Sequence, residues 1–132
     1  MKKHYFGNIE EETEKNENFR KVIWTGGHSQ LVLMSLPVGC DIGVEIHPNV
    51  DQFFRIESGE GKVIMDGEEM GFSDNFAFIV PAGVEHNVIN TGDKDLKLYT
   101  IYSPANHIDS RVHKTKEEAV ADTEDEEFGH SV

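Results

Sequence analysis

The chain has 132 residues, a length that suits one domain around one hydrophobic core. It carries 25 Asp and Glu against 12 Lys and Arg, and its formal net charge of −13 disfavours nucleic acid and anionic lipid surfaces as partners. No segment approaches the ~20 apolar residues that a membrane span requires, so we expect no membrane insertion.

The start of the chain and its cysteine content both suggest a cytoplasmic protein. Residues 1–19, MKKHYFGNIEEETEKNENF, include early lysines but lack the apolar core of a signal peptide. Cys40 is the only cysteine, so no disulfide can form within the chain. We therefore expect a cytoplasmic location.

Acidic and apolar residues divide the chain into three segments. Residues 1–18 and 114–132 are rich in Glu and Asp and poor in large apolar side chains, which predicts solvated acidic arms at both ends. The C-terminal arm contains a Glu- and Ala-rich stretch over 114–121 that favours a short helix. Residues 19–113 are expected to form the folded domain.

Short runs rich in Val, Ile, Phe and Tyr follow one another through this domain. We expect strands, separated by turns with Gly, Pro, Asn and Asp, at 20–24, 30–36, 42–46, 52–56, 61–65, 75–80, 86–90 and 96–102. Asp66–Gly67 is a strong hairpin signal because type I′ turns need positive φ at both central residues. Many short strands at close spacing predict an all-β fold, either an antiparallel sandwich or a barrel.

The stretch 45–52, EIHPNVDQ, combines side chains that can bind a metal. Glu45 and His47 are two residues apart in an expected strand, so both side chains face the same side. Gln52 shares a face of the next strand with Phe54, which places its amide at the rim of the interior. A buried amide needs partners, and a metal ion is one option for its carbonyl oxygen.

A second segment, PAGVEHNVIN at 81–90, places His86 at the start of a strand. Pro81 and Gly83 form the turn that precedes it. On its own, a histidine at this place is more often a hydrogen-bonded structural residue than a metal ligand. The prediction of a metal site depends on the two segments together.

These two segments resemble the two motifs of the cupin superfamily. The first family motif runs Gly, five residues, His-x-His, three or four residues, Glu, six residues and Gly. This chain has, in the same order, Gly39, five residues, Glu45-Ile-His47, four residues, Gln52, six residues and Gly59. The second motif is matched by Pro81-Ala-Gly83, His86 and Asn90, while Asn75 replaces its leading glycine.

The resemblance covers residues 30–103 and implies a double-stranded β-helix, a jelly-roll barrel of two antiparallel sheets over 19–113. The wider stretches around both motifs also resemble a bacterial cupin-2 group that is labelled mannose-6-phosphate-isomerase-like. In the superfamily, metal ligands project into the barrel.

By this resemblance, the four metal-ligand positions fall on Glu45, His47, Gln52 and His86. The first family His is replaced by Glu45 and the family Glu by Gln52, yet the set keeps a single negative charge. Two His and one carboxylate can hold a divalent transition metal such as Fe, Mn, Zn or Ni. Asp51 is a rival to Gln52, although only Gln52 keeps the spacing to the glycine that ends the motif. The remaining alternative is a barrel that binds no metal.

The resemblance implies a small-molecule ligand or substrate and, as in similar cupins, a homodimer. One predicted function is isomerisation or epimerisation of a sugar-like molecule. The alternatives are a non-haem metal-dependent dioxygenase and a ligand-binding module without catalysis, because one fold hosts many chemistries. No catalytic acid–base pair is identified in the sequence, since His107 and His113 follow the last expected strand and are expected at the surface.

Overall fold

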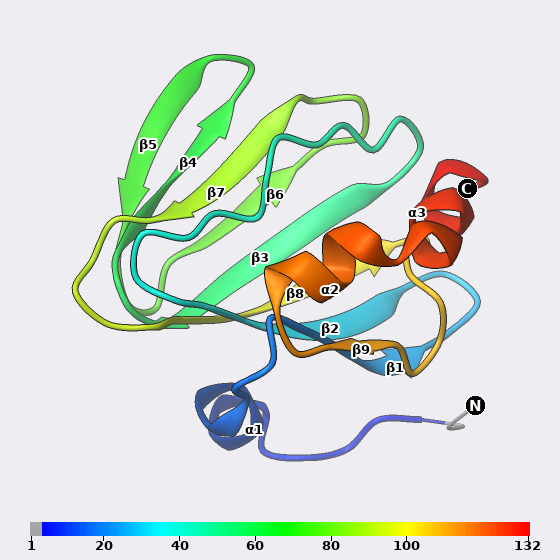
Figure 1. Cartoon of the computed structure of the whole chain (residues 1–132), viewed down its shortest axis with the longest axis horizontal. Helices are drawn as coiled ribbons and strands as arrows, with labels where there is room; N and C mark the ends of the chain where they lie inside the picture. Colours follow the sequence, from blue (N-terminus) through cyan, green and yellow to red (C-terminus); the bar gives the residue numbers. More distant parts are fainter. Residues whose placement is uncertain (1–3) are drawn as a thin grey trace.

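The computed structural model describes residues 4–132 as two antiparallel β-sheets with short helices at both ends of the chain (Figure 1). In chain order the elements are α1 (Ile9–Lys15), β1 (Arg20–Thr25), β2 (Gln30–Leu36), β3 (Asp51–Ser58), β4 (Gly61–Met65), β5 (Glu68–Phe72), β6 (Ala77–Val80), β7 (His86–Asn90), β8 (Leu96–Ser103), β9 (Val112–His113), α2 (Lys116–Ala121) and α3 (Thr123–His130). The larger sheet has the order β6-β3-β8-β2-β1-β9, and the smaller has the order β5-β4-β7. The predicted two-sheet jelly roll is confirmed, but within residues 4–132 the strand ladders do not close into one barrel.

The expected strands form, with one exception at 42–46. This segment runs beside β7 and makes only isolated bridges, Asp41 with Ile89 and Glu45 with His86. Gly43 has a φ of 109°, and its N–H donates to the side chain of Asn87 rather than to a neighbouring backbone. The segment is therefore a loop pinned to β7, and not a full strand.

The hairpin predicted at Asp66–Gly67 is confirmed between β4 and β5. The two residues have φ values of 48° and 85°, the left-handed conformation that a type I′ turn requires. Val63 lies opposite Met70 in the resulting ladder. The small β9, which pairs with β1 through Val112 and His113, was not expected.

The apolar core lies between the sheets, and a row of polar side chains is buried beside it. Phe54 is fully buried, and its ring stacks on that of Phe78 with 4.8 Å between centroids. In the larger sheet, a row of three residues runs across neighbouring strands: Gln30 on β2, Tyr102 on β8 and Gln52 on β3. All three are buried, so this row brings polar groups into the interior.

The N-terminal acidic segment is packed in part, which differs from the solvated arm expected from its composition. Asn8 caps α1 by accepting a hydrogen bond from the Glu11 N–H at 3.1 Å. The helix contacts β8 and β3, and Thr13 on its inner face is fully buried. Lys97 of β8 donates to the backbone carbonyl of Asn16, which ties the end of the helix to the sheet.

The C-terminal segment folds into two helices. The helix expected at 114–121 is confirmed as α2, which begins after Thr115, the residue whose hydroxyl accepts from the Glu118 N–H at 3.2 Å. The following α3 was not expected. Figure 1 shows both helices, in orange and red, beside the loop between β2 and β3. No helix within residues 4–132 is long and apolar enough to cross a membrane.

Candidate metal centre and ligand pocket

Backbone pairing places Glu45 directly opposite His86. The Glu45 N–H donates to the His86 carbonyl, and the His86 N–H donates to the Glu45 carbonyl, each at 2.9 Å. Val44 and Ile46 are exposed, whereas His47 is buried. The alternation expected along this segment is therefore observed, and Glu45 and His47 share the face that looks into the molecule.

His47 connects the two motif segments. Its Nε2 lies 3.4 Å from the Glu45 Oε2, and its ring centroid is 5.3 Å from that of His86. Burial lowers the pKa of His47 to about 4, and the neighbouring carboxylate of Glu45 opposes this only in part. The imidazole is therefore neutral at neutral pH, which is the form that binds metal ions.

His86 is buried and oriented through one ring nitrogen. Its Nδ1 lies 2.9 Å from the carbonyl oxygen of Val84. A carbonyl can only accept, so Nδ1 carries the proton and the lone pair remains on Nε2. A backbone partner of this kind commonly fixes the ring of a metal-binding histidine.

Gln52 has an unsatisfied oxygen in the interior. Its side chain is only 2% exposed, and its Nε2 donates to the Thr100 hydroxyl at 3.0 Å. Its Oε1 has no hydrogen-bond partner among residues 4–132, which is unusual for a buried amide. Asp51, the rival ligand, is exposed, and its Oδ1 accepts from the Ala82 N–H at 2.9 Å. Burial and orientation therefore favour Gln52 over Asp51.

The donor set fits a divalent transition metal in its chemistry. It offers two imidazoles, one carboxylate and one amide oxygen that needs a partner. Within the described residues, however, Glu45, His47 and His86 do not gather their ligand atoms within 4.8 Å of one another. The four predicted ligands therefore lie near one another, but their ligand atoms are too far apart to surround a single metal ion in this arrangement.

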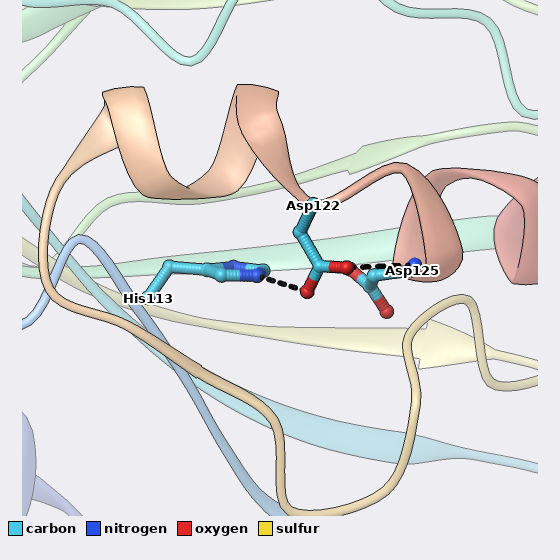
Figure 2. A group of neighbouring side chains, drawn as sticks. All are labelled: His113, Asp122 and Asp125. Carbon is cyan, nitrogen blue, oxygen red and sulfur yellow. Dashed lines mark hydrogen bonds and ion pairs between the residues drawn. The ribbon is translucent and has the colours of Figure 1, made fainter.

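Within residues 4–132, one group of His and Asp side chains does reach that spacing, and Figure 2 shows it: His113, Asp122 and Asp125. Its carboxylate oxygens are already engaged. Asp122 accepts from His113 at 2.9 Å, from Arg111 at 2.7 Å and from the Asp125 N–H at 3.1 Å. These contacts tie the tail to β9, so we interpret the group as a structural hydrogen-bond network.

His107 and His113, expected at the surface, are both buried. His107 Nδ1 lies 2.7 Å from the Asp125 carboxylate, and His107 Nε2 lies 3.1 Å from the Tyr102 hydroxyl. Because an ionised carboxylate only accepts, Nδ1 carries the proton and Nε2 accepts from Tyr102. Asp125, His107 and Tyr102 therefore form a continuous hydrogen-bonded chain, which we call the relay.

The relay has the charge states that proton transfer requires. Burial, followed by the charge of Arg20, lowers the pKa of His107, so the ring is neutral. Burial is the largest single influence on the pKa of Asp125 and raises it, but the hydrogen bond and charge of His107, the Ile108 N–H and the charge of Arg20 together lower that pKa. Burial raises the pKa of Tyr102, so its hydroxyl keeps its proton. The Tyr102 ring also meets the His47 ring edge-on, 5.8 Å between centroids.

A pocket of about 430 Å³ opens beside the candidate metal centre. It lies between the loop 42–48 and helices α2 and α3, and its polar lining includes Arg20, Glu45, His47 and His107. The loop and the tail are linked by an ion pair between Lys116 and Asp41. The pocket is therefore walled in part by the C-terminal tail.

Sequence reasoning located the two motif segments but missed the relay and the tail. His107 and Asp125 lie 18 positions apart, and no motif spacing connects them. The burial of Arg20 follows from the inward face of β1, where Val22 is also buried. The alternation of buried and exposed side chains along β1 was therefore the one signal in the sequence that could have predicted the burial of Arg20.

Relatives of known sequence or structure match most of the chain. YrkC of Bacillus subtilis (strain 168) is 53% identical over 125 residues, which cover 90% of this chain and 67% of the relative. The crystal structure of BH2720 from Bacillus halodurans has a TM-score of 0.87 at 48% identity, over 89% of this chain and 93% of that chain. KdgF from Halomonas sp. has a TM-score of 0.61 at 22% identity, over 65% of this chain and 77% of that chain, a likeness that concerns the fold alone.

The family model described as a cupin domain matches residues 32–102. This range begins in β2 and ends in β8, and it includes all four predicted metal ligands. The resemblance seen in the two motifs is therefore confirmed at the level of the superfamily. The chain belongs to the cupin domain family.

Proposed function

We propose that the chain is a small metal-binding cupin that acts as an isomerase or epimerase on a sugar-like small molecule. The relay beside the candidate metal centre carries this proposal. An isomerase needs a group that removes a proton and returns it, placed next to the substrate. His107 lines the pocket and is held by Asp125 on one side and Tyr102 on the other.

The metal part of the proposal rests on Glu45, His47, Gln52 and His86. The Gln52 Oε1 is buried without a partner, and the Nε2 of His86 keeps its lone pair. When bound, a divalent metal ion such as Fe, Mn, Zn or Ni would polarise an oxygen atom of the substrate.

The residues of the chain itself would handle the proton. Neutral His107 can accept a proton at Nε2, and the Asp125 carboxylate stabilises the imidazolium that results. Tyr102 keeps its hydroxyl proton in the hydrogen bond to His107 Nε2. Removal of a proton from one carbon and its return to the opposite face of that carbon gives epimerisation. Return of the proton to the neighbouring carbonyl carbon, with the hydroxyl proton moved to the former carbonyl oxygen, gives isomerisation.

A second candidate is a non-haem metal-dependent dioxygenase. It is favoured by the ligand types, because two His and one carboxylate form the set that such enzymes use. Glu45 and His47, two of these ligands, already lie 3.4 Å apart. The third candidate is a module that binds a small molecule without converting it.

Metal analysis followed by activity assays separates these candidates. The purified chain is loaded in turn with Fe, Mn, Zn and Ni, and its metal content is measured. It is then incubated with aldose, ketose and epimer pairs in D₂O, while oxygen uptake is recorded. We expect stoichiometric metal and deuterium incorporation into the isomerised sugar, without oxygen uptake.

The variant His107→Gln tests the relay. It is expected to keep its metal and to lose activity by about 10²–10⁴-fold, the usual contribution of a positioned acid or base. His28→Gln, at an exposed loop position, is the matched control. Oxygen uptake would instead support the dioxygenase, and ligand binding without turnover would support the binding module. A chain that never holds a stoichiometric ion would contradict the metal-binding function.

A further inference from the structure

Arg20 is a buried cation in the wall of the pocket. It lies on β1 opposite Met34 of β2 and His113 of β9, with its side chain on the inner face of the larger sheet. The residue is only 7% exposed, and it lines the pocket together with His47 and His107. Its guanidinium carbon lies 5.3 Å from the centre of the Phe19 ring.

Arg20 has no carboxylate partner in the part of the chain that the structure describes. None of the ion pairs within 4.0 Å includes it, and its buried Nε has no hydrogen-bond partner. The other two arginines differ. Arg55 contacts Glu57 at 3.2 Å, and Arg111 contacts Asp122 at 2.7 Å.

A buried guanidinium without a carboxylate partner is costly, because removing a charge from water is repaid only by a well-placed partner. The carboxylate of the relay, on Asp125, is already occupied by His107 and by the Ile108 N–H. The chain has 25 acidic residues, yet none of those described pairs with Arg20. A negatively charged ligand in the pocket would supply the missing partner.

We propose that the ligand of this pocket is a small organic acid whose carboxylate is bound by Arg20. This inference deepens the proposed function by naming the substrate class of the same site, and it rests on that function. The planar guanidinium matches a carboxylate with two parallel hydrogen bonds.

The charges around the pocket favour a carboxylate over a phosphate. Glu45, Asp125 and Glu126 also line the pocket. Lys116 also lines the pocket but is paired with Asp41, so a doubly charged phosphate would meet these acids with the Arg20 guanidinium to balance it, whereas a carboxylate carries a single charge. The volume of about 430 Å³ accommodates a small organic molecule.

Calorimetric titration of the 132-residue chain tests this proposal. The probes are malate, glycerate and benzoate, each compared with its amide, and inorganic phosphate, all at one pH and ionic strength. Each titration is run on metal-loaded and on chelated protein. We expect at least one carboxylate to bind, its amide to bind at least 10-fold more weakly, and phosphate to bind more weakly than the carboxylate.

Two substitutions identify the residue. Arg20→Gln is expected to weaken carboxylate binding by about 10–100-fold, the range of a charged hydrogen bond. Arg20→Met is expected to abolish binding while melting no lower than the original chain, because it removes a buried charge that has no carboxylate partner. Arg55→Gln removes the same charge from a residue outside the pocket and is expected to leave binding unchanged.

A measurement on the unsubstituted chain does not depend on how the variants fold. The Nε–H signal of Arg20 in an NMR spectrum is expected to move as the bound carboxylate is added. The proposal is overturned if no carboxylate in the panel binds, if phosphate alone binds, or if that signal stays fixed. The chain could bind a carboxylate through Arg20 and yet hold no stoichiometric metal. That result would uphold this inference and contradict the proposed metal function, so failure of one can be told apart from failure of the other.

Discussion

Replacing Asp125 with Asn tests whether a buried contact with His107 holds the C-terminal tail. Asp125 accepts from His107 Nδ1 and from the Ile108 N–H, each at 2.7 Å. Asn keeps an oxygen for Ile108, but its NH₂ group faces the Nδ1–H of His107, so one charge-assisted hydrogen bond is lost. Such a bond is worth about 1.5–3 kcal/mol. For a domain of this length, that loss lowers Tm by about 5–15 °C.

Thermal unfolding measured by circular dichroism gives the change in Tm, and trypsin cleavage at Lys114 and Lys116 reports local release of the tail. Glu124→Gln is the matched control, since it makes the same acid-to-amide change on the same helix. The Glu124 side chain is 77% exposed. Its ion pair with Arg111 is worth about 0–1 kcal/mol. Equal Tm values and equal cleavage rates in the two variants would refute the reasoning.

Two further predictions concern acid stability and backbone strain. The hydrogen bond from His113, joined by others and opposed by burial, lowers the pKa of Asp122 from 3.8 to about 2. The stability that Asp122 contributes is therefore complete above pH ~4 and is lost as the pH falls toward ~2. The NMR shifts of the backbone amides in the tail should change in this pH window. A titration midpoint above pH ~5 would contradict the lowered pKa of Asp122. Gly59 has a φ of 113°, and an added Cβ would lie 3.1 Å from the Leu96 backbone, whereas Gly39, with a φ of 77°, has open space. In urea unfolding, Gly59→Ala should cost about 1 kcal/mol or more beyond Gly39→Ala, and equal costs would show that the close approach is relieved.

Local patterns were sufficient to predict most of the fold. Alternation of apolar residues located β2 and β8, and the Asp66–Gly67 turn located the β4–β5 hairpin, because these features depend on near neighbours in sequence. The strand expected at 42–46 was wrong because its backbone groups find only isolated partners on β7. Whether a segment forms a continuous strand ladder depends on its hydrogen bonds to a segment far away in the sequence. The alternation of apolar and polar residues carries no information about that partner.

The candidate site was predictable only where a motif carried it. Parity placed Glu45 and His47 on one face, and the motif resemblance added His86, which the structure pairs with Glu45. The unsatisfied oxygen of Gln52 supports its choice over Asp51. The relay was not predictable, because it joins β8, the loop after it and α3 through long-range packing. The ligand roles, the identity of the metal, the homodimer and the cytoplasmic location stay predictions. Light scattering at working concentration tests the dimer.

The central claim is that a metal ion is held between the two motif segments. Anomalous diffraction from a crystal of the metal-loaded chain, collected at the absorption edge of the loaded ion, locates that ion directly. We expect one peak within bonding distance of His47 and His86, with Glu45 and the Gln52 oxygen as the remaining protein ligands. A peak at His113, Asp122 and Asp125 alone, or a fully loaded crystal without a peak between the motif segments, would contradict the account.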